Sequence, residues 1–376
     1  MDIKEFGYQF DKDLIAKHPL NKRDESKLLV VDVKNLNVEH KRFYELVDYI
    51  EPGDVIVINN SYVKKARIFG KRNTGGKVEI FIVDFPYTPD FNIYPLKLRS
   101  LIRSHKKIKE NEKIIISPFG DNDKEIRNED KYAGIKIKNQ KTCMITAKKH
   151  YGGGIWDILI NSKEDCDYIF NHCAGIPLPP YIKRQTNKND EIFYQTIYAN
   201  KNAGYSVAAP TAGLHFTDTL IKNIKKKGAV FAKITLNIGL GTFMPVRKRD
   251  ITKHVMHDER YTITEQTAQI INEAKKNNKK VIITGTSSVR CLESSTDKGG
   301  TVMPVTDGVT SLYIYPGYKF KITGNLITNF HQPESSLFIM ISALVGLNTA
   351  KKIYKKGLDN KYSLFSYGDA MFLYNI

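Results

Sequence analysis

The run AVFAKITL (229–236) is followed by a helix pattern that opens at Thr264-Glu265 and then by VIITG (281–285). Runs rich in β-branched residues predict strands, and a capping threonine before a periodic stretch predicts a helix start. LITNF (326–330) predicts a further strand, and the almost wholly apolar SSLFIMISALVG (335–346) predicts a buried helix. Strands that alternate with helices in this way are typical of a parallel or mixed α/β sheet.

The amino-terminal half supplies two more strands and then a different pattern. LLVVDV (28–33) and DVIVIN (54–59) are short β-rich runs bounded by turn or charged residues. Between about residues 66 and 150, short β-rich pieces alternate with Gly, Asn, Asp and Pro: KVEIFIV (77–83), EKIIIS (112–117), AGIKIK (133–138) and TCMITA (142–147). Many short strands without a helix pattern of comparable strength predict an all-β module, and a small barrel is the form we expect.

The glycine run Tyr151-Gly-Gly-Gly154 reads as the end of this module, because glycines mark flexible or tightly turned junctions. We therefore predict a mixed α/β main domain built from both ends of the chain, residues 1–65 plus 151–376. An all-β barrel domain, residues 66–150, is inserted into it.

The 376 residues contain no run of about 18 apolar residues and no apolar segment typical of a secretory signal near the amino terminus. We expect a cytoplasmic protein, a monomer, with no membrane partner. Four cysteines show no CxxC pairing. Cys166, His172 and Cys173 could be three metal ligands, but no fourth lies at a zinc-finger spacing, so buried or free thiols are favoured and no metal site is predicted.

Lys and Arg exceed Asp and Glu by 58 − 40 = 18, which favours an anionic partner such as a nucleic acid. Much of the excess is lysine in runs such as Lys225-Lys226-Lys227, and solvated helix faces would explain these equally well. Charge alone leaves both interpretations open.

Four segments combine small and polar residues where a strand gives way to a turn or helix, which is where ligands bind in α/β folds. The first two are AAPTAGLHFT (208–217), with Thr211 and His215, and TLNIGLGTFMP (235–245), with Gly239 and Gly241. His215 could act as acid, base or donor, or bond to the backbone as a structural histidine. The glycine pair lacks the full dinucleotide fingerprint, so a tight turn is an alternative.

The third segment is GTSSVR (285–290) with Glu293 after it. Its hydroxyls and helix-start amides could hold an anion or a ribose. Arg290 and Glu293 could equally form an ion pair on one helix face. The fourth, NFHQPES (329–335), contains His331 and Glu334, and FSYGDAM (365–371) contains Tyr367 and Asp369 around a glycine turn.

In combination these segments resemble the S-adenosylmethionine:tRNA ribosyltransferase-isomerases of queuosine biosynthesis, and the similarity runs from end to end. The segments that carry it include PGDVIVINN (52–60), ARIFG (66–70), PLPPYI (177–182), YQTIY (194–198), AAPTAGLHF (208–216), HVMH (254–257), GTSSVR (285–290), NFH (329–331) and FSYGDAM (365–371). The sequence departs from the family pattern at Asn237, where the family usually has histidine, and by one extra residue around 204–206.

The resemblance implies an α/β domain with an inserted β-barrel. It implies S-adenosylmethionine as a consumed ribosyl donor, with no cofactor and no metal. The acceptor would be 7-aminomethyl-7-deazaguanine at the tRNA wobble position, and the products epoxyqueuosine-tRNA, adenine and methionine.

Within this reading, His215 and His331 are candidates for proton transfer. Glu293, Glu334 or Asp369 could stabilise the sulfonium and orient the ribose hydroxyls, with Glu293 counted among the catalytic residues. Arg290 could hold the methionine carboxylate or a tRNA phosphate. The remaining predicted donor- or tRNA-binding residues are Thr211, Asn237, Gly239, Gly241, Thr286, Ser287 and Tyr367. In the inserted domain Arg99, Arg103, Lys106 and Lys107 could follow phosphates.

Two other functions stay open. An S-adenosylmethionine-dependent RNA methyltransferase would release S-adenosylhomocysteine. A catalytically silent tRNA-binding protein, suggested by Asn237, would bind tRNA without consuming the donor.

Overall fold

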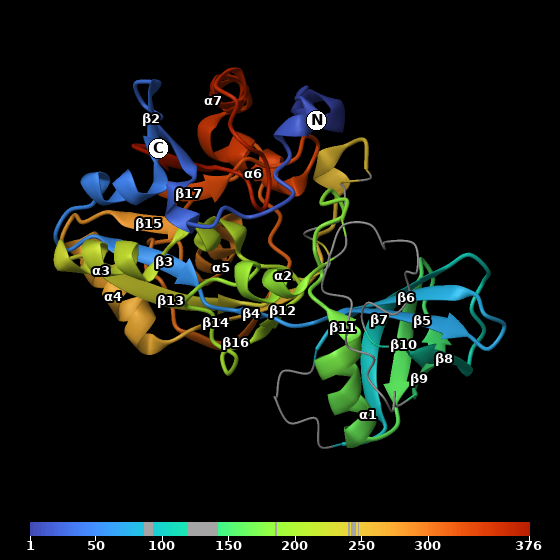
Figure 1. The fold of residues 1–376 in the computed structure, drawn as a ribbon. Coiled ribbons are helices and arrows are strands. Elements are labelled where there is room, and N and C mark those ends of the chain that lie inside the picture. Colours follow the sequence, from blue (N-terminus) through green and yellow to red (C-terminus); the bar gives the residue numbers. More distant parts are fainter. Residues whose placement is uncertain are drawn as a thin grey trace. The chain divides into compact units, whose positions relative to one another are not determined.

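The computed structural model describes residues 1–85, 93–116, 118, 142–184, 186–239, 241, 246 and 248–376 (Figure 1). The chain divides into two compact units. The main unit comprises Met1–Tyr62, Leu178–Gln185 and Ile192–Ile376, and the barrel unit comprises Val63–Pro177 and Thr186–Glu191.

A nine-stranded mixed sheet forms the centre of the main unit. Its strands lie in the order β16 (Val305–Thr310), β14 (Glu259–Ile263), β13 (Val230–Leu236), β3 (Val55–Asn59), β15 (Val281–Thr284), β17 (Asn325–Asn329), β18 (Ala370–Tyr374), β1 (Lys27–Asp32) and β2 (Asn37–Arg42). The four strands β13, β3, β15 and β17 run parallel to one another. Their carboxyl ends therefore meet at one edge of the sheet, which is where an α/β fold places its ligands.

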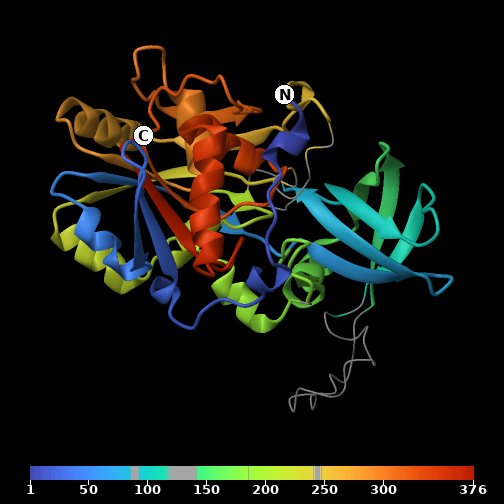
Figure 2. The same cartoon turned by 90° about the horizontal axis from the view of Figure 1, so that it is seen from above.

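Alternate residues of the central strands pack into two different cores, as the two-residue period of a strand requires. Val55 and Val57 belong to the core on one side of the sheet, whereas Ile56 and Ile58 belong to the core on the other side. The first core is covered by α4 (Glu265–Lys276), α5 (Thr286–Ser295), α6 (Ser336–Val345) and α7 (Leu347–Asp359), and the second by α3 (Asp218–Lys226) and the 3-10 helix η4 (Phe43–Tyr49). Figure 2 shows these helices on the two faces.

Hydroxyl side chains begin three of these helices, and the starts of α4 and α6 agree with the sequence-based predictions. Thr217 caps α3, Thr264 caps α4 and Ser335 caps α6, each accepting a hydrogen bond from a backbone amide of the first turn. Helix α6 is largely buried, which its apolar composition requires.

The barrel unit is a closed six-stranded barrel. Its strands run β5 (Arg67–Arg72), β6 (Lys77–Asp84), β7 (Leu96–Ser104), β10 (Ile155–Ile160), β9 (Cys143–His150) and β8 (Glu112–Ile116), and β8 pairs with β5 to close it. The α/β fold with an inserted β-barrel is thus confirmed. Three of the predicted barrel strands match β6, β8 and β9, while AGIKIK (133–138) lies outside the described residues.

The chain stays in the barrel unit beyond residue 150, where the sequence analysis placed its end. The Tyr151–Gly154 segment is the turn between β9 and β10, and β10 pairs with both β9 and β7. Helix α1 (Lys163–Tyr168), the π-helix η5 (Ile169–Cys173) and β11 (Ala174–Gly175) follow before the main unit resumes at Leu178.

The remaining elements are short: β4 (Tyr62–Val63), β12 (Tyr205–Ser206), α2 (Lys188–Phe193), and the 3-10 helices η1 (Ile3–Phe6), η2 (Lys12–Leu14), η3 (Arg23–Glu25), η6 (Thr211–His215) and η8 (Ile251–Lys253). Over the described part of the chain no single helix is long and apolar enough to cross a membrane, although the bent pair α6 and α7 passes that test jointly by length and composition.

Candidate active site

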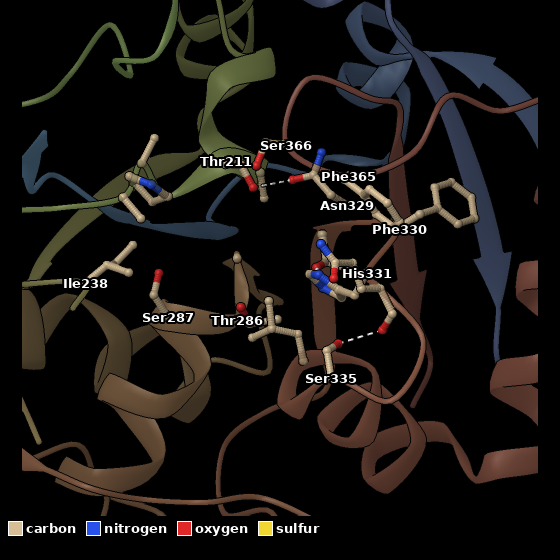
Figure 3. Close-up of a pocket in the computed structure, with 18 of the residues that line it drawn as sticks. Thr211, Ile238, Thr286, Ser287, Asn329, Phe330, His331, Ser335, Phe365 and Ser366 are labelled. Carbon is tan, nitrogen blue, oxygen red and sulfur yellow. Dashed lines mark hydrogen bonds between the residues drawn. The ribbon is translucent and has the colours of Figure 1, made fainter. Parts of the chain in front are cut away.

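A cavity of about 350 Å³ opens in the main unit beyond the carboxyl ends of β15 and β17. Helix α5 begins at its wall, and the loop between β17 and α6 forms another side (Figure 3). Six of the predicted site residues line it: Thr211, Thr286, Ser287, Arg290, His331 and Glu334. The structure therefore brings together residues that are up to 123 positions apart, between Thr211 and Glu334.

His331 is fixed in the cavity wall through its ring and through its backbone. Its Nε2 lies 2.8 Å from the Thr328 hydroxyl oxygen. Its backbone amide donates to the Tyr354 hydroxyl over 3.0 Å, and its carbonyl accepts a hydrogen bond from the Tyr8 hydroxyl. Burial lowers the pKa of His331 to about 3. The imidazole is therefore neutral around pH 7.

Glu334 lies three residues further along the same loop and is exposed. Its φ of +57° is in the left-handed region, which a residue with a side chain rarely adopts. The backbone amide donates to the Phe6 carbonyl over 3.1 Å, which holds the loop in this conformation. Among the described residues nothing forms a hydrogen bond or ion pair with its carboxylate. A strained residue with an unpaired charge beside a cavity is a candidate for binding a cation.

The start of α5 offers hydrogen-bond donors to the cavity. Gly285 precedes the helix with φ +84°, and no side chain caps the first turn. The first amides of a helix have no partner within it and carry a partial positive charge. The hydroxyl-bearing residues Thr286 and Ser287 of the first turn line the cavity as well. This wall of the cavity is suited to an anion or to the hydroxyls of a ribose.

Arg290 lines the cavity but is already bound. One guanidinium nitrogen pairs with the carboxylate of Glu259, and Nε donates to the Leu312 carbonyl over 2.9 Å. The side chains of Arg290 and Glu259 are only 8% and 4% exposed. Glu259 also accepts the backbone amide of Gly239 at 2.9 Å. The pair therefore holds the glycine segment beside α5, and Glu259 neutralises the positive charge of Arg290.

His215 does not line the cavity and reaches it through Asn329. The Asn329 side-chain amide donates to His215 Nε2 over 3.1 Å, and its oxygen accepts from the Thr211 hydroxyl over 2.9 Å. The other ring nitrogen, Nδ1, lies 2.8 Å from the Ser26 hydroxyl oxygen. Burial lowers the pKa of His215 to about 4, so it too is neutral near pH 7. His215 is therefore a positioning group for Asn329 and Thr211.

Glu293 lies on α5, 1% exposed, and outside the cavity lining. Its carboxylate accepts hydrogen bonds from the backbone amides of residues 321, 322 and 323, and from the hydroxyls of Thr323 and Tyr318. These five donors make Glu293 an anchor for the segment that precedes β17. The Arg290–Glu293 ion pair, which the sequence left open as an alternative, does not form, since Arg290 pairs with Glu259 instead.

Asp369 has a similar structural environment. Its two oxygens accept the backbone amides of Lys27 and Ser363, each over 2.7 Å. Burial raises the pKa of its carboxyl. Tyr367 lies nearby in a second, much smaller hollow that also contains His215 and Arg23. Neither Asp369 nor Tyr367 is among the residues that line the large cavity.

Asn237, Gly239 and Gly241 also lie outside the lining of the large cavity, although Ile238 between them contributes to it. The Asn237 amide oxygen is buried without a hydrogen-bond partner. A Cβ added at Gly204 would lie 2.3 Å from that oxygen, so the glycine there allows the close approach. Part of the glycine segment, residues 240 and 242–245, lies outside the described residues.

Sequence reasoning missed Glu259, Asn329 and Tyr8 as parts of the site. Asn329 lies two residues before His331 in a segment that the sequence analysis singled out. Its polar side chain could therefore have been predicted to belong to the site. Glu259 and Tyr8 carry no such signal, because each reaches the site from a distant part of the chain. No cluster of three or more His, Cys, Asp or Glu side chains suited to a metal occurs within the described ranges, and the four cysteines are buried and form no disulfide there.

The chain consists of an α/β unit and a closed β-barrel unit, and the α/β unit has a cavity beyond its parallel strands. The protein is therefore a two-unit α/β protein with a small-molecule site. The family model of the queuosine biosynthesis protein matches residues 3–373. The chain belongs to this family, and it is an enzyme of the transferase and isomerase type that acts in queuosine biosynthesis and tRNA modification.

Curated relatives match over nearly their whole length. The S-adenosylmethionine:tRNA ribosyltransferase-isomerase of Sulfurihydrogenibium sp. (strain YO3AOP1) is 38% identical over 99% of this chain and 100% of its own. The protein of the same name from Fusobacterium nucleatum is 40% identical over 99% and 97%. A solved structure of S-adenosylmethionine tRNA ribosyltransferase from Thermotoga maritima is 26% identical with a TM-score of 0.51, and it covers 98% of this chain and 99% of that one.

Proposed function

We propose that this enzyme transfers and isomerises the ribosyl group of S-adenosylmethionine onto 7-aminomethyl-7-deazaguanine at the wobble position of tRNA. The products would be epoxyqueuosine-tRNA, adenine and methionine. The observation that carries the proposal is the cavity, where an unpaired carboxylate, a neutral imidazole and an uncapped helix start face one small volume. S-Adenosylmethionine presents a sulfonium cation, a carboxylate and ribose hydroxyls, which these groups complement.

The start of α5 would bind the anionic or hydroxyl part of the donor. The amides of its first turn and the hydroxyls of Thr286 and Ser287 supply donors without a further cation. Arg290 is paired with Glu259, so its contribution would be to the shape of this wall rather than to a second ion pair.

Glu334 and His331 would act at the reacting end of the donor. The carbon next to the sulfonium must lose a proton, and a neutral imidazole can accept one. The Glu334 carboxylate would stabilise the sulfonium before the reaction and the imidazolium formed afterwards. In the overall reaction the acceptor nitrogen exchanges one proton for a bond to the sugar, adenine leaves with a proton, and methionine leaves with the electron pair of its carbon–sulfur bond. The electron pair left by the proton taken from the carbon next to the sulfonium stays in the rearranged sugar, and one proton is released in net through His331. Thr211 and Asn329, oriented by His215, would hold the ribose hydroxyls.

No cofactor and no metal enter this proposal, since the donor itself is consumed. The monomeric state and the cytoplasmic location expected from the sequence remain predictions.

The test is chromatography of the reaction of the purified protein with S-adenosylmethionine and an anticodon stem-loop that carries the aminomethyl-deazaguanine. We expect adenine, methionine and a heavier RNA. The same stem-loop with guanine at the wobble position is the matched control and should release no adenine. S-Adenosylhomocysteine as the product would instead establish a methyltransferase.

RNA binding without donor consumption would support the silent binding protein and would direct attention to Asn237. Since Asn237 does not line the cavity, we expect the wild-type protein to be active and the Asn237→Ala variant to retain at least about a third of its turnover. If the wild type is inactive and Asn237→His restores adenine release, the reaction is correctly assigned. The asparagine at position 237 is then the cause of the lost activity.

A further inference from the structure

A cluster of positively charged and aromatic side chains surrounds one buried carboxylate on the outside of the barrel unit. Asp157 on β10 is 1% exposed. It accepts a hydrogen bond from Arg99 Nε over 2.7 Å and from the Tyr151 hydroxyl over 2.7 Å, and Lys97 Nζ lies 2.9 Å from its second oxygen. Three donors therefore converge on one carboxylate, which fixes the direction of each side chain.

The strand register explains why these residues meet. Asp157 is the direct partner of Arg99 on β7 and of Lys149 on β9, so the three side chains form a row across adjacent strands. Lys97 lies two residues before Arg99 and thus on the same face of β7. The Tyr151 ring completes the cluster, with the Arg99 guanidinium carbon 4.1 Å and Lys149 Nζ 5.2 Å from its centroid.

The cations of the cluster are accessible although the carboxylate is not. The side chains of Lys97 and Arg99 are 61% and 40% exposed, whereas that of Asp157 is 2% exposed. Beside them Gly152 and Gly153 adopt positive φ values of +88° and +57°, and a Cβ at either would meet nothing within 4 Å. Bare backbone and three oriented cations are thus open to a large anionic partner, with the Asp157 carboxylate buried beneath them. Asp84 on β6, which is exposed, is the register partner of Arg99 on its other side, so three cations stand with two carboxylates on this face.

We propose that Lys97, Arg99 and Lys149 form a docking site for the phosphate backbone of the tRNA, with Tyr151 as the residue that positions Arg99 and Lys149. The inference rests on the proposed function, which supplies the polyanionic partner. It identifies which part of the barrel binds this partner: the face of β7, β10 and β9 beside the glycine turn. A cation paired on one side with a buried carboxylate loses little side-chain freedom when it binds a phosphate on the other.

The test measures binding of the full-length protein to the tRNA at a series of salt concentrations. The variant Lys97→Gln/Lys149→Gln removes two exposed charges, and Lys225→Gln/Lys226→Gln on α3 of the main unit is the control with the same charge change. We expect the first variant to bind about tenfold more weakly, with a log–log salt slope smaller by about 1.4, as for two lost phosphate contacts. The control should stay within about twofold of the wild type.

Donor consumption at saturating tRNA separates docking from catalysis. The Lys97→Gln/Lys149→Gln variant should show a raised KM for tRNA and an unchanged kcat. Equal binding by this variant and the control would overturn the docking site while leaving the proposed function intact. A wild-type protein that does not bind tRNA would overturn both.

A second pair of variants tests the role of Tyr151. Tyr151→Phe keeps the ring against which Arg99 and Lys149 pack, and it should retain binding within about twofold. Tyr151→Leu removes the ring and should weaken binding about fivefold, with thermal unfolding unchanged. Equal affinities for these two variants would remove Tyr151 from the site.

Discussion

Glu293 and Glu334 both belong to the main unit, yet their carboxylates have opposite environments. Glu293 is buried and accepts five hydrogen bonds from the segment 318–323. Glu334 is exposed at the cavity, and its carboxylate has no hydrogen-bond or ion-pair partner among the described residues. A carboxylate that is fully bonded stabilises the fold, whereas one held without partners by a strained backbone is available to a ligand.

The two histidines differ in the same way. Both ring nitrogens of His215 are used, by Ser26 and by Asn329, and its ring stacks on Phe43 at 4.9 Å. His331 lines the cavity, and its ring is held by the Thr328 hydroxyl through one nitrogen. Both residues are buried histidines in segments that the sequence singled out. The number of hydrogen bonds that each imidazole ring makes within the protein therefore separates the structural residue from the candidate for catalysis.

The largest expected effect is on stability at Glu293. Replacing Glu293 by Ala leaves five buried or half-buried donors without their acceptor, and we expect a loss of about 4 kcal/mol in the free energy of unfolding. Urea unfolding followed by circular dichroism measures this. Glu334→Ala is the matched control and should change stability by less than about 0.5 kcal/mol. Similar losses for the two variants would remove the distinction between the two carboxylates.

The next largest effect is on turnover at His331. Replacing it by Gln keeps a hydrogen-bonding side chain but removes the group that accepts a proton. We expect kcat for adenine release to fall at least about a hundredfold, equivalent to about 2.7 kcal/mol in the barrier. His215→Gln, which acts only through Asn329, should lose about tenfold or less. A larger loss at His215 than at His331 would reverse the roles we assign.

Much of the fold could be predicted because strand and helix patterns are local. The strands 54–59, 229–236 and 281–285, and the helix starts at Thr264 and Ser335, all depend on a few neighbouring residues. The end of the barrel unit could not be predicted in this way. Three glycines after Tyr151 read as a domain junction, but the same residues also suit a tight turn between two strands, and only the pairing of β10 with β7 decides between them.

The candidate site could be predicted in part for the same reason. Thr211, Thr286, Ser287, Arg290, His331 and Glu334 follow strands whose carboxyl ends meet, so their gathering follows from the topology. Whether a given side chain is already bonded depends on segments far away in sequence. Glu259 reaches Arg290 from 31 positions away, and Tyr8 reaches His331 from 323. No local pattern carries this information.

The third prediction concerns the pH dependence of stability, to which we expect His215 and His331 to contribute in the same direction. Their pKa values fall from 6.5 in the unfolded chain to about 4 for His215 and about 3 for His331 in the folded protein. Below pH 6.5 the unfolded chain binds protons that the native state does not, so stability is lost as the pH falls towards these values. At pH 5 we expect each histidine to contribute a loss of about 2 kcal/mol relative to pH 7.

Unfolding of the wild type and of His215→Gln and His331→Gln at pH 7 and pH 5 measures this contribution. Each variant should lose less stability than the wild type between the two pH values, because glutamine does not titrate. Parallel pH profiles for all three proteins would mean that neither histidine is held neutral by burial.

The smallest expected effect is on the stability of variants at Glu334, where the cost of the backbone conformation can be measured separately from the role of the carboxylate. Its φ of +57° is costly for a residue with a Cβ but not for glycine. Glu334→Gly should therefore stabilise the protein by about 1 kcal/mol while it lowers the rate of adenine release. Glu334→Gln keeps the strain and removes only the charge, so it should lower activity without raising stability. If both variants leave activity unchanged, the unpaired carboxylate is not used. If Glu334→Gly fails to stabilise, the contact between its backbone amide and Phe6 does not hold a strained conformation, and the contrast with Glu293 then rests on hydrogen bonding alone.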